Sequence, residues 1–167
     1  MLLTLHIAAT FLVSIGWALA LAHALEMPGK LRLSRESYID AQTIYYPGFT
    51  IGGLFGEAGA IVATLALVIA TGMSGREFLL TLAALLALLA MHATYWIVTH
   101  PVNKFWLRGR TLDSLGAGFF GLGKRGRGTA ATADAWIALR NRWEYSHVLR
   151  AAFAGAALLC LIVALAP

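Results

Sequence analysis

The sequence predicts an all-α membrane protein, a four-helix transmembrane bundle with a long cytoplasmic loop between the third and fourth helices. Of its 167 residues, 59% are hydrophobic and 13% are charged, whereas a soluble domain carries about 25% charged residues. The apolar residues gather in four blocks, at about residues 2–25, 49–71, 78–99 and 145–166. Each block has roughly the 20 residues that a helix needs to cross about 30 Å of hydrocarbon. We expect one integral membrane domain, residues 1–167.

The first block has one feature of a secretory signal peptide, because small residues of the Ala-x-Ala type stand near its end. A signal peptide, however, has a basic segment before an apolar run of about 7–15 residues. No Lys or Arg precedes this block, and its apolar run is longer. We therefore expect the first block to be retained as a membrane span.

The later blocks are rich in small residues. The second block carries them at every fourth position: Gly48, Gly52, Gly56 and Ala60. The third block is rich in alanine, and the fourth has Ala151 and Gly155 in the same spacing. Such ridges let helix backbones approach closely in lipid, which predicts a tightly packed bundle. The same ridges could also serve dimerisation, so a homo-oligomer stays open.

Two segments before the fourth block have distinct compositions. Residues 132–142 are alanine-rich and are expected to continue into the fourth span as one helix of about 35 residues, which would project beyond the bilayer. Residues 116–128 are glycine-rich and basic. They do not match a phosphate-binding loop, because no GK[ST] motif follows and no strand precedes them. We expect this segment to lie against the lipid surface.

Positive charge is concentrated on one side of the predicted bundle. Twelve of the 13 Lys and Arg residues lie in the segments 26–48 and 100–144 or at their borders, and Arg76 is the exception. The positive-inside rule then places both long segments in the cytoplasm and both termini on the non-cytoplasmic side. The net charge is +5. Because the basic residues border apolar blocks, anionic lipid headgroups are the expected partner, rather than nucleic acid.

Two ionisable residues lie well inside the predicted spans. Glu57 lies about 17 residues before the centre of the predicted turn at 72–75, and His92 about 17 residues after it. Antiparallel helices therefore place these side chains at about the same depth. Ionisable groups in hydrocarbon are costly and often functional. The spacing predicts a carboxylate–imidazole pair, in which each group offsets part of the other's burial cost.

All four spans send polar residues into the same half of the bilayer, the half on the basic side. We predict catalytic roles for Glu57, His92 and Arg150. We predict cofactor-binding roles for His23, Asn103, Trp143 and His147. The candidate metal ligands are His23, Glu57, His92 and His147. Polar groups that converge within an apolar bundle are typical of a cofactor or substrate pocket.

Three kinds of chemistry suit these residues, and the sequence leaves the cofactor unknown. Histidine and carboxylate ligands suit iron, copper or zinc, and Glu144 and His147 have the Glu-x-x-His spacing of a bundle metal site. Two histidines at similar depth could instead ligate haem b. Without a cofactor, Glu57 and His92 could act as a general base on an apolar, acidic small molecule such as a phenol. A non-catalytic accessory or anchoring subunit of a larger membrane complex is the alternative to an enzyme.

Three stretches carry a family resemblance: residues 23–30 (HALEMPGK), 100–104 (HPVNK) and 141–150 (NRWEYSHVLR). They resemble the anthrone oxygenase-like family of small four-span membrane proteins, which is largely of unknown function. The resemblance covers most of the chain in layout and implies a four-helix membrane bundle. For some members it implies oxygenation of a polycyclic phenolic anthrone to a quinone. The matching positions are Asn103, Trp143, His147 and Arg150. Together with the convergent polar residues, it leads us to expect a membrane oxidoreductase or oxygenase.

Overall fold

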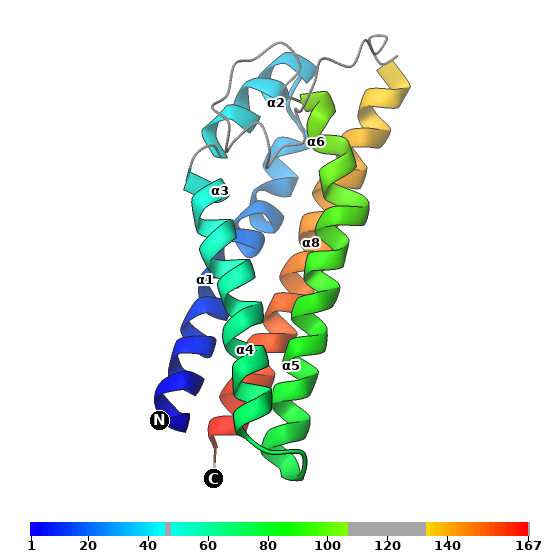
Figure 1. The fold of residues 1–167 in the computed structure, drawn as a ribbon. Coiled ribbons are helices and arrows are strands. Elements are labelled where there is room, and N and C mark those ends of the chain that lie inside the picture. The colour runs from blue at the N-terminus through cyan, green and yellow to red at the C-terminus, as the bar shows by residue number, and fades with distance from the viewer. Residues whose placement is uncertain (46–47, 107–132, 167) are drawn as a thin grey trace.

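The computed structural model describes residues 1–45, 48–106 and 133–166, and in this part of the chain every regular element is helical (Figure 1). Four helices are long and apolar enough to cross a membrane: Leu2–Lys30, Gly48–Ala70, Gly75–Asn103 and Ala135–Leu165. The predicted all-α bundle of four spans is thereby confirmed. Residues 107–132, which include most of the predicted long loop and its segment 116–128, lie outside the described residues.

The spans are built from the following elements. The first span is α1 (Leu2–Lys30), and the fourth is α8 (Ala133–Leu165). The second span consists of α3 (Gly48–Gly53), the π-helical turn η2 (Leu54–Ala58) and α4 (Gly59–Ala70). The third consists of α5 (Gly75–Thr94), the π-helical turn η3 (Tyr95–Thr99) and α6 (His100–Trp106). As predicted, the alanine-rich segment before the fourth block belongs to one continuous helix, which has 33 residues.

The predicted loop between the first two spans was wrong in its extent, because much of residues 26–48 is helical. α1 continues through Pro28 to Lys30 and is followed by α2 (Arg35–Gln42) and the short 3-10 turn η1 (Thr43–Tyr45). The Ser34 hydroxyl caps α2 by accepting a hydrogen bond of 3.2 Å from the Ser37 backbone N–H. This cap satisfies a donor that the first helical turn leaves free, which is why a short polar segment forms a helix here.

The two ends of the bundle are formed by different parts of the chain. Both termini and the turn between α4 and α5 lie at one end, and α2 and α6 lie at the other (Figure 1). Gly72 and Gly75 have φ angles of +78° and +90°, so the turn uses backbone conformations that side chains disfavour. We name these ends the terminus end and the α2 end.

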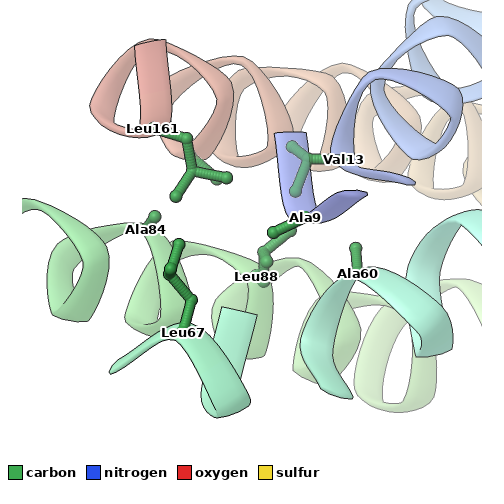
Figure 2. Close-up of a cluster of buried hydrophobic side chains, with 8 residues drawn as sticks. Ala9, Val13, Ala60, Leu67, Ala84, Leu88 and Leu161 are labelled. Carbon is green, nitrogen blue, oxygen red and sulfur yellow. The ribbon is translucent and has the colours of Figure 1, made fainter. Parts of the chain in front are cut away.

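Apolar packing fills the half of the bundle toward the terminus end. Side chains from α1, α4, α5 and α8 point toward one another there (Figure 2). The buried members of this cluster are Ala9, Val13, Ala60, Leu67, Ala84, Leu88, Ala157 and Leu161. Four of these residues are alanine, and the small size of alanine lets the helices approach closely, as the alanine-rich composition predicts.

Two spans approach each other closely at Gly16 of α1 and Gly56 of η2. A Cβ atom on Gly56 would lie 2.8 Å from the Gly16 backbone nitrogen, and one on Gly16 would lie 3.4 Å from the Gly56 carbonyl oxygen. One turn earlier, a Cβ on Gly52 would meet the Leu19 side chain at 2.9 Å. The predicted small-residue ridge therefore packs against α1 inside the bundle.

Replacing Gly56 with alanine is expected to lower the free energy of unfolding by about 1–3 kcal/mol, since the added methyl group meets backbone rather than a flexible side chain. Gly48→Ala is the matched control, because nothing lies within 4 Å of a Cβ placed there. Thermal unfolding of both variants in detergent would measure the difference. Equal stability of the two would contradict this packing.

Candidate functional site

A cavity of about 40 Å³ lies in the core between all four spans. Its walls include His23 from α1, Glu57 from η2, Tyr95 from η3 and His147 from α8. The predicted convergence of polar residues is therefore observed. Six of the seven predicted site residues line this cavity: His23, Glu57, Asn103, Trp143, His147 and Arg150. The seventh, His92, does not.

One face of α8 supplies three of these residues. Trp143, His147 and Arg150 follow one another at helical spacing and are 3%, 3% and 8% exposed. The Trp143 indole Nε1–H donates a hydrogen bond of 2.8 Å to Asn103 Oδ1, which joins α8 to α6. This contact fixes the indole at the α2 end of the cavity.

His147 is held in one tautomer by its own helix. Its Nδ1 lies 2.9 Å from the Trp143 carbonyl oxygen. A carbonyl only accepts hydrogen bonds, so Nδ1 carries the proton and donates it. In the neutral ring, Nε2 then keeps its lone pair, which makes it the nitrogen that can accept a proton or ligate a metal.

A chain of hydrogen bonds runs from the outer surface of the bundle to Arg150. The Trp96 indole Nε1–H donates to His92 Nε2 at 2.8 Å, and His92 Nδ1 lies 2.8 Å from Glu57 Oε1. Because an indole nitrogen can only donate, His92 must be the neutral tautomer that donates from Nδ1 to the carboxylate. The other Glu57 oxygen accepts a hydrogen bond from Arg150 Nη2. Glu57 thus joins its predicted partner His92 to Arg150.

His92 nevertheless faces outward. Its side chain is 41% exposed, whereas that of Glu57 is 9% exposed, and the neighbouring Trp96 is 52% exposed. His92 is therefore connected to the cavity wall through its hydrogen bond to Glu57. It does not meet a molecule inside the cavity in this arrangement.

The two π-helical turns lie beside this chain of hydrogen bonds. η2 contains Glu57, and η3 begins three residues after His92. η3 also brings Tyr95 and Thr99 to the cavity wall, and the Thr99 hydroxyl lies 2.8 Å from that of Ser146 on α8. π-helical turns are uncommon and occur frequently at functional sites.

His23 sits against His147 within an aromatic wall. The two imidazole centroids are 4.3 Å apart, and the rings of Tyr45, Phe49 and Trp143 lie 4.4, 4.6 and 5.2 Å from His23. Among the described residues, the buried His23 Nδ1 atom has no hydrogen-bond partner. Aromatic side chains therefore form much of the cavity wall around His23 and His147.

A second buried polar cluster, which the sequence analysis did not predict as a site, closes the α2 end. Glu144 is 0% exposed. Its carboxylate lies 3.0 Å from Lys30 Nζ and accepts a hydrogen bond of 2.8 Å from the Tyr38 hydroxyl of α2. The Lys30 ammonium also lies over the rings of Tyr45 and Trp143, at 5.4 and 5.0 Å. Glu144 is therefore engaged with Lys30 and Tyr38, although its Glu-x-x-His spacing suggested a metal ligand beside His147.

The pKa values of two tyrosines in this cluster are raised. Burial and the neighbouring Glu144 carboxylate raise the pKa of Tyr38. Burial and the hydrogen bond to Glu26, which measures 2.7 Å, raise the pKa of Tyr45. Both hydroxyls therefore stay protonated in the fold at pH values where an unfolded chain ionises.

The fold is accordingly expected to lose stability as the pH rises past about 10, where the tyrosines of the unfolded chain ionise. The sign follows from the raised pKa values, because the unfolded state releases protons that the folded state retains. Thermal unfolding in detergent at several alkaline pH values would show the loss. The double variant Tyr38→Phe/Tyr45→Phe should show a smaller loss, and an unchanged pH dependence in it would contradict this account.

The four predicted metal ligands form two separate pairs, Glu57 with His92 and His23 with His147. Within the described ranges, no group of three or more His, Cys, Asp or Glu side chains is arranged to hold a metal ion. A haem does not fit either. Imidazole centroids 4.3 Å apart leave no room for an iron with one ring on each side, and a cavity of about 40 Å³ is far smaller than a porphyrin.

The fold and the site together define the class of protein: a multi-pass helical membrane protein with a core cavity that both apolar and polar side chains line. Comparison of the chain with protein-family models, with curated proteins and with solved structures found no match. The case for a function therefore depends on the site itself.

Proposed function

We propose that this chain is a multi-pass membrane oxidoreductase or oxygenase that acts on a small, lipid-soluble aromatic molecule of the phenol or quinone type. One observation carries the proposal: the imidazole of His147, whose Nδ1 is hydrogen-bonded to the Trp143 carbonyl, and the guanidinium of Arg150 line the same cavity in the core. A proton acceptor and a fixed cation side by side, in surroundings of low dielectric, are suited to form and hold an aryl oxyanion.

Each residue has a defined part in this chemistry. His147 Nε2 accepts the proton of the phenolic hydroxyl, and Arg150 stabilises the resulting oxyanion. Glu57 holds the guanidinium in place and offsets the cost of burying its charge. In the oxidation of a hydroquinone, the substrate loses two electrons and two protons. Dioxygen gains them and becomes hydrogen peroxide, which balances the reaction.

The resemblance to the anthrone oxygenase-like family supports this reaction class, because it implies oxidation of a phenolic molecule to a quinone. Four of the cavity residues, Asn103, Trp143, His147 and Arg150, are the positions that carry the resemblance. Trp143 is hydrogen-bonded to Asn103, His147 to the Trp143 carbonyl, and Arg150 to Glu57. These residues therefore lie close together in the fold.

The proposed enzyme is tested with the purified protein in lipid nanodiscs that contain an alkyl-substituted hydroquinone. We expect dioxygen uptake with formation of quinone, which absorbs light differently from the hydroquinone. Elemental analysis and a search for the Soret band of haem on the same sample determine whether a metal or haem accompanies the chain. No uptake above empty nanodiscs with hydroquinones, phenols or anthrones would overturn the proposal.

We also propose that the α2 end faces the cytoplasm and that both termini face the other side. The basic residues near the α2 end, among them Arg32, Arg35 and Arg140, support this orientation through the positive-inside rule and favour anionic headgroups there. A cysteine placed at Arg32 in a Cys160→Ala background should escape a membrane-impermeant thiol reagent added to intact cells. Labelling from outside would show that the α2 end faces away from the cytoplasm.

An accessory or anchoring subunit of a membrane complex is the second candidate function, and one observation favours it. His92 and Trp96 present a hydrogen-bonded polar pair on the outside of the bundle, where ionisable residues are rare in membrane proteins. A partner helix or a second copy of this chain could cover them. In that case Trp96→Leu would abolish the cellular phenotype, while His147→Ala would leave it intact.

A further inference from the structure

Spans two and three lie side by side near the turn that joins them but separate toward the α2 end (Figure 1). Within the described residues, α4 packs against α5, whereas α3 and η2 pack against α1, and η3 and α6 pack against α8. In this part of the chain, neither α3 nor η2 packs extensively against η3 or α6. The α2 half of the bundle is therefore divided into two helix pairs. We name the boundary between spans two and three in this half the lateral seam.

Each helix pair has close contacts of its own. Span two meets α1 at Gly56 and Gly16, where the two backbones lie so close that a Cβ on Gly56 would clash with the Gly16 nitrogen. Span three meets α8 through the hydroxyl groups of Thr99 and Ser146, which lie 2.8 Å apart. Neither boundary can widen without losing these contacts.

At the lateral seam, one hydrogen bond joins the cavity wall to the outer surface of the bundle. Glu57 lines the cavity, and its Oε1 accepts the hydrogen bond of 2.8 Å from His92 Nδ1. His92 and its other partner, Trp96, are exposed on the outside, which faces lipid in a membrane-spanning bundle. If this bond breaks, Glu57 keeps its contact with Arg150, and His92 keeps its contact with Trp96. Opening the seam therefore leaves neither side chain without a partner.

The cavity is too small for an aromatic ring, so its wall must move before a ring can enter. Its volume of about 40 Å³ is well below the roughly 150 Å³ of a protein cavity that binds benzene. Each side of the lateral seam contains a π-helical turn, η2 in span two and η3 in span three. Helices bend at such turns. The seam is therefore the part of the wall that can move with the least loss of packing.

From these contacts together we infer that lipid-soluble molecules enter the cavity sideways from the hydrocarbon, through the lateral seam, and that the hydrogen bond between His92 and Glu57 keeps this entrance closed. The inference goes beyond the proposed function, because it concerns how a molecule reaches the site. It rests on that function only for the aromatic class of the molecule. It gives a role to His92, the predicted site residue that does not line the cavity.

The first test measures how fast a molecule enters. The protein in nanodiscs is mixed rapidly with nitrophenol, and the saturable quenching of tryptophan fluorescence is followed in time. His92→Leu removes the hydrogen bond across the lateral seam and should raise the association rate constant about tenfold, the effect of one well-formed hydrogen bond. Ser146→Ala is the matched control, because it removes a hydrogen bond between spans three and four, and it should leave this rate constant unchanged.

The second test places an obstacle at the seam and does not require that His92→Leu folds. Single cysteines are placed at Trp96, beside the seam, and at Leu159, which is exposed on α8, both in a Cys160→Ala background. Each variant is compared before and after labelling with a bulky maleimide. The label on Trp96→Cys should slow the association of nitrophenol severalfold, and the label on Leu159→Cys should not.

Several outcomes would overturn the inference. An association rate constant in His92→Leu within about twofold of the wild-type value, or an equal acceleration in Ser146→Ala, would show that this hydrogen bond does not control entry. Equal slowing by the labels on Trp96→Cys and Leu159→Cys would exclude the lateral seam as the route. The absence of saturable quenching in the wild type and in His92→Leu would show that the seam admits no molecule of this kind.

The failure of this inference is distinguishable from failure of the proposed function. Faster association in His92→Leu without any dioxygen uptake would leave a membrane protein with a lateral entrance that is not an oxidoreductase. Oxidation of hydroquinone by a protein in which neither variant alters the association rate would leave the enzyme but remove this entrance.

Discussion

Replacing Lys30 with methionine is expected to lower the free energy of unfolding by about 3–5 kcal/mol, because it leaves a buried carboxylate without its cation. Glu144 is 0% exposed, and Lys30 Nζ lies 3.0 Å from it. The second carboxylate near this ammonium, Glu26, lies 3.7 Å away and is 44% exposed, so water can solvate it. Chemical or thermal unfolding in detergent micelles would measure the loss.

Two further variants test the cause. Arg32→Met removes a cation from the exposed surface of the same segment and should change the stability by much less. Adding Glu144→Gln to Lys30→Met should recover much of the loss, because the buried group is then neutral and its contact with Tyr38 remains possible. A Lys30→Met protein as stable as the Arg32→Met control would show that this ion pair contributes little.

Replacing His147 with alanine is expected to reduce hydroquinone oxidation by about 10²–10⁴-fold, the usual contribution of a positioned general base. The comparison uses dioxygen uptake at saturating hydroquinone, so that the loss is read from kcat. Alanine at position 147 also removes the Nδ1–H bond to the Trp143 carbonyl, so the unfolding temperature is measured on the same sample.

His6→Ala is the matched control for this loss. His6 is also buried, at 2% exposure, and its Nε2 lies 2.9 Å from the Leu161 carbonyl oxygen, but it belongs to the terminus end of the bundle. Its replacement should cost stability and leave kcat unchanged. A His147→Ala enzyme with a kcat within about threefold of the wild type would remove His147 from the mechanism.

The spans and one pair inside them could be predicted from the sequence because both depend on distances along the chain. A run of roughly 20 apolar residues sets the length of a span. Equal distances from a short turn set the matched depth of Glu57 and His92, whose hydrogen bond of 2.8 Å confirms the prediction. The gathering of polar residues in one half of the bundle follows from the same reasoning about depth.

The direction in which each side chain points could not be predicted in the same way. In a soluble helix, polar residues mark the outer face, but a membrane span is apolar on all sides. The sequence therefore gave no sign that His92 faces outward or that Arg150 meets Glu57. The π-helical turns η2 and η3, which also rotate the side chains that follow them, have no recognisable sequence pattern.

The contacts among Lys30, Tyr38 and Glu144 at the α2 end could not be predicted for a different reason. Tyr38 and Glu144 are 106 positions apart and meet only because α2 folds back over the end of the bundle. The Glu-x-x-His spacing drew attention to Glu144, yet local spacing cannot show that Lys30 and Tyr38 already engage the carboxylate. Long-range partners of this kind require the three-dimensional structure.

The central claim is that the functional site lies in the core cavity. Locating a bound molecule tests this claim most directly, because binding in the cavity and binding on the outer surface near Trp96 would protect different residues from a thiol reagent. Single cysteines are placed at Phe49, which lines the cavity, and at Trp96, which is 52% exposed outside it, both in a Cys160→Ala background. Their reaction with a small, lipid-permeant thiol reagent is timed with and without nitrophenol. We predict that nitrophenol slows labelling of Phe49→Cys severalfold and leaves Trp96→Cys unchanged. Protection of Trp96→Cys alone, or of neither cysteine, would contradict a functional site in the core.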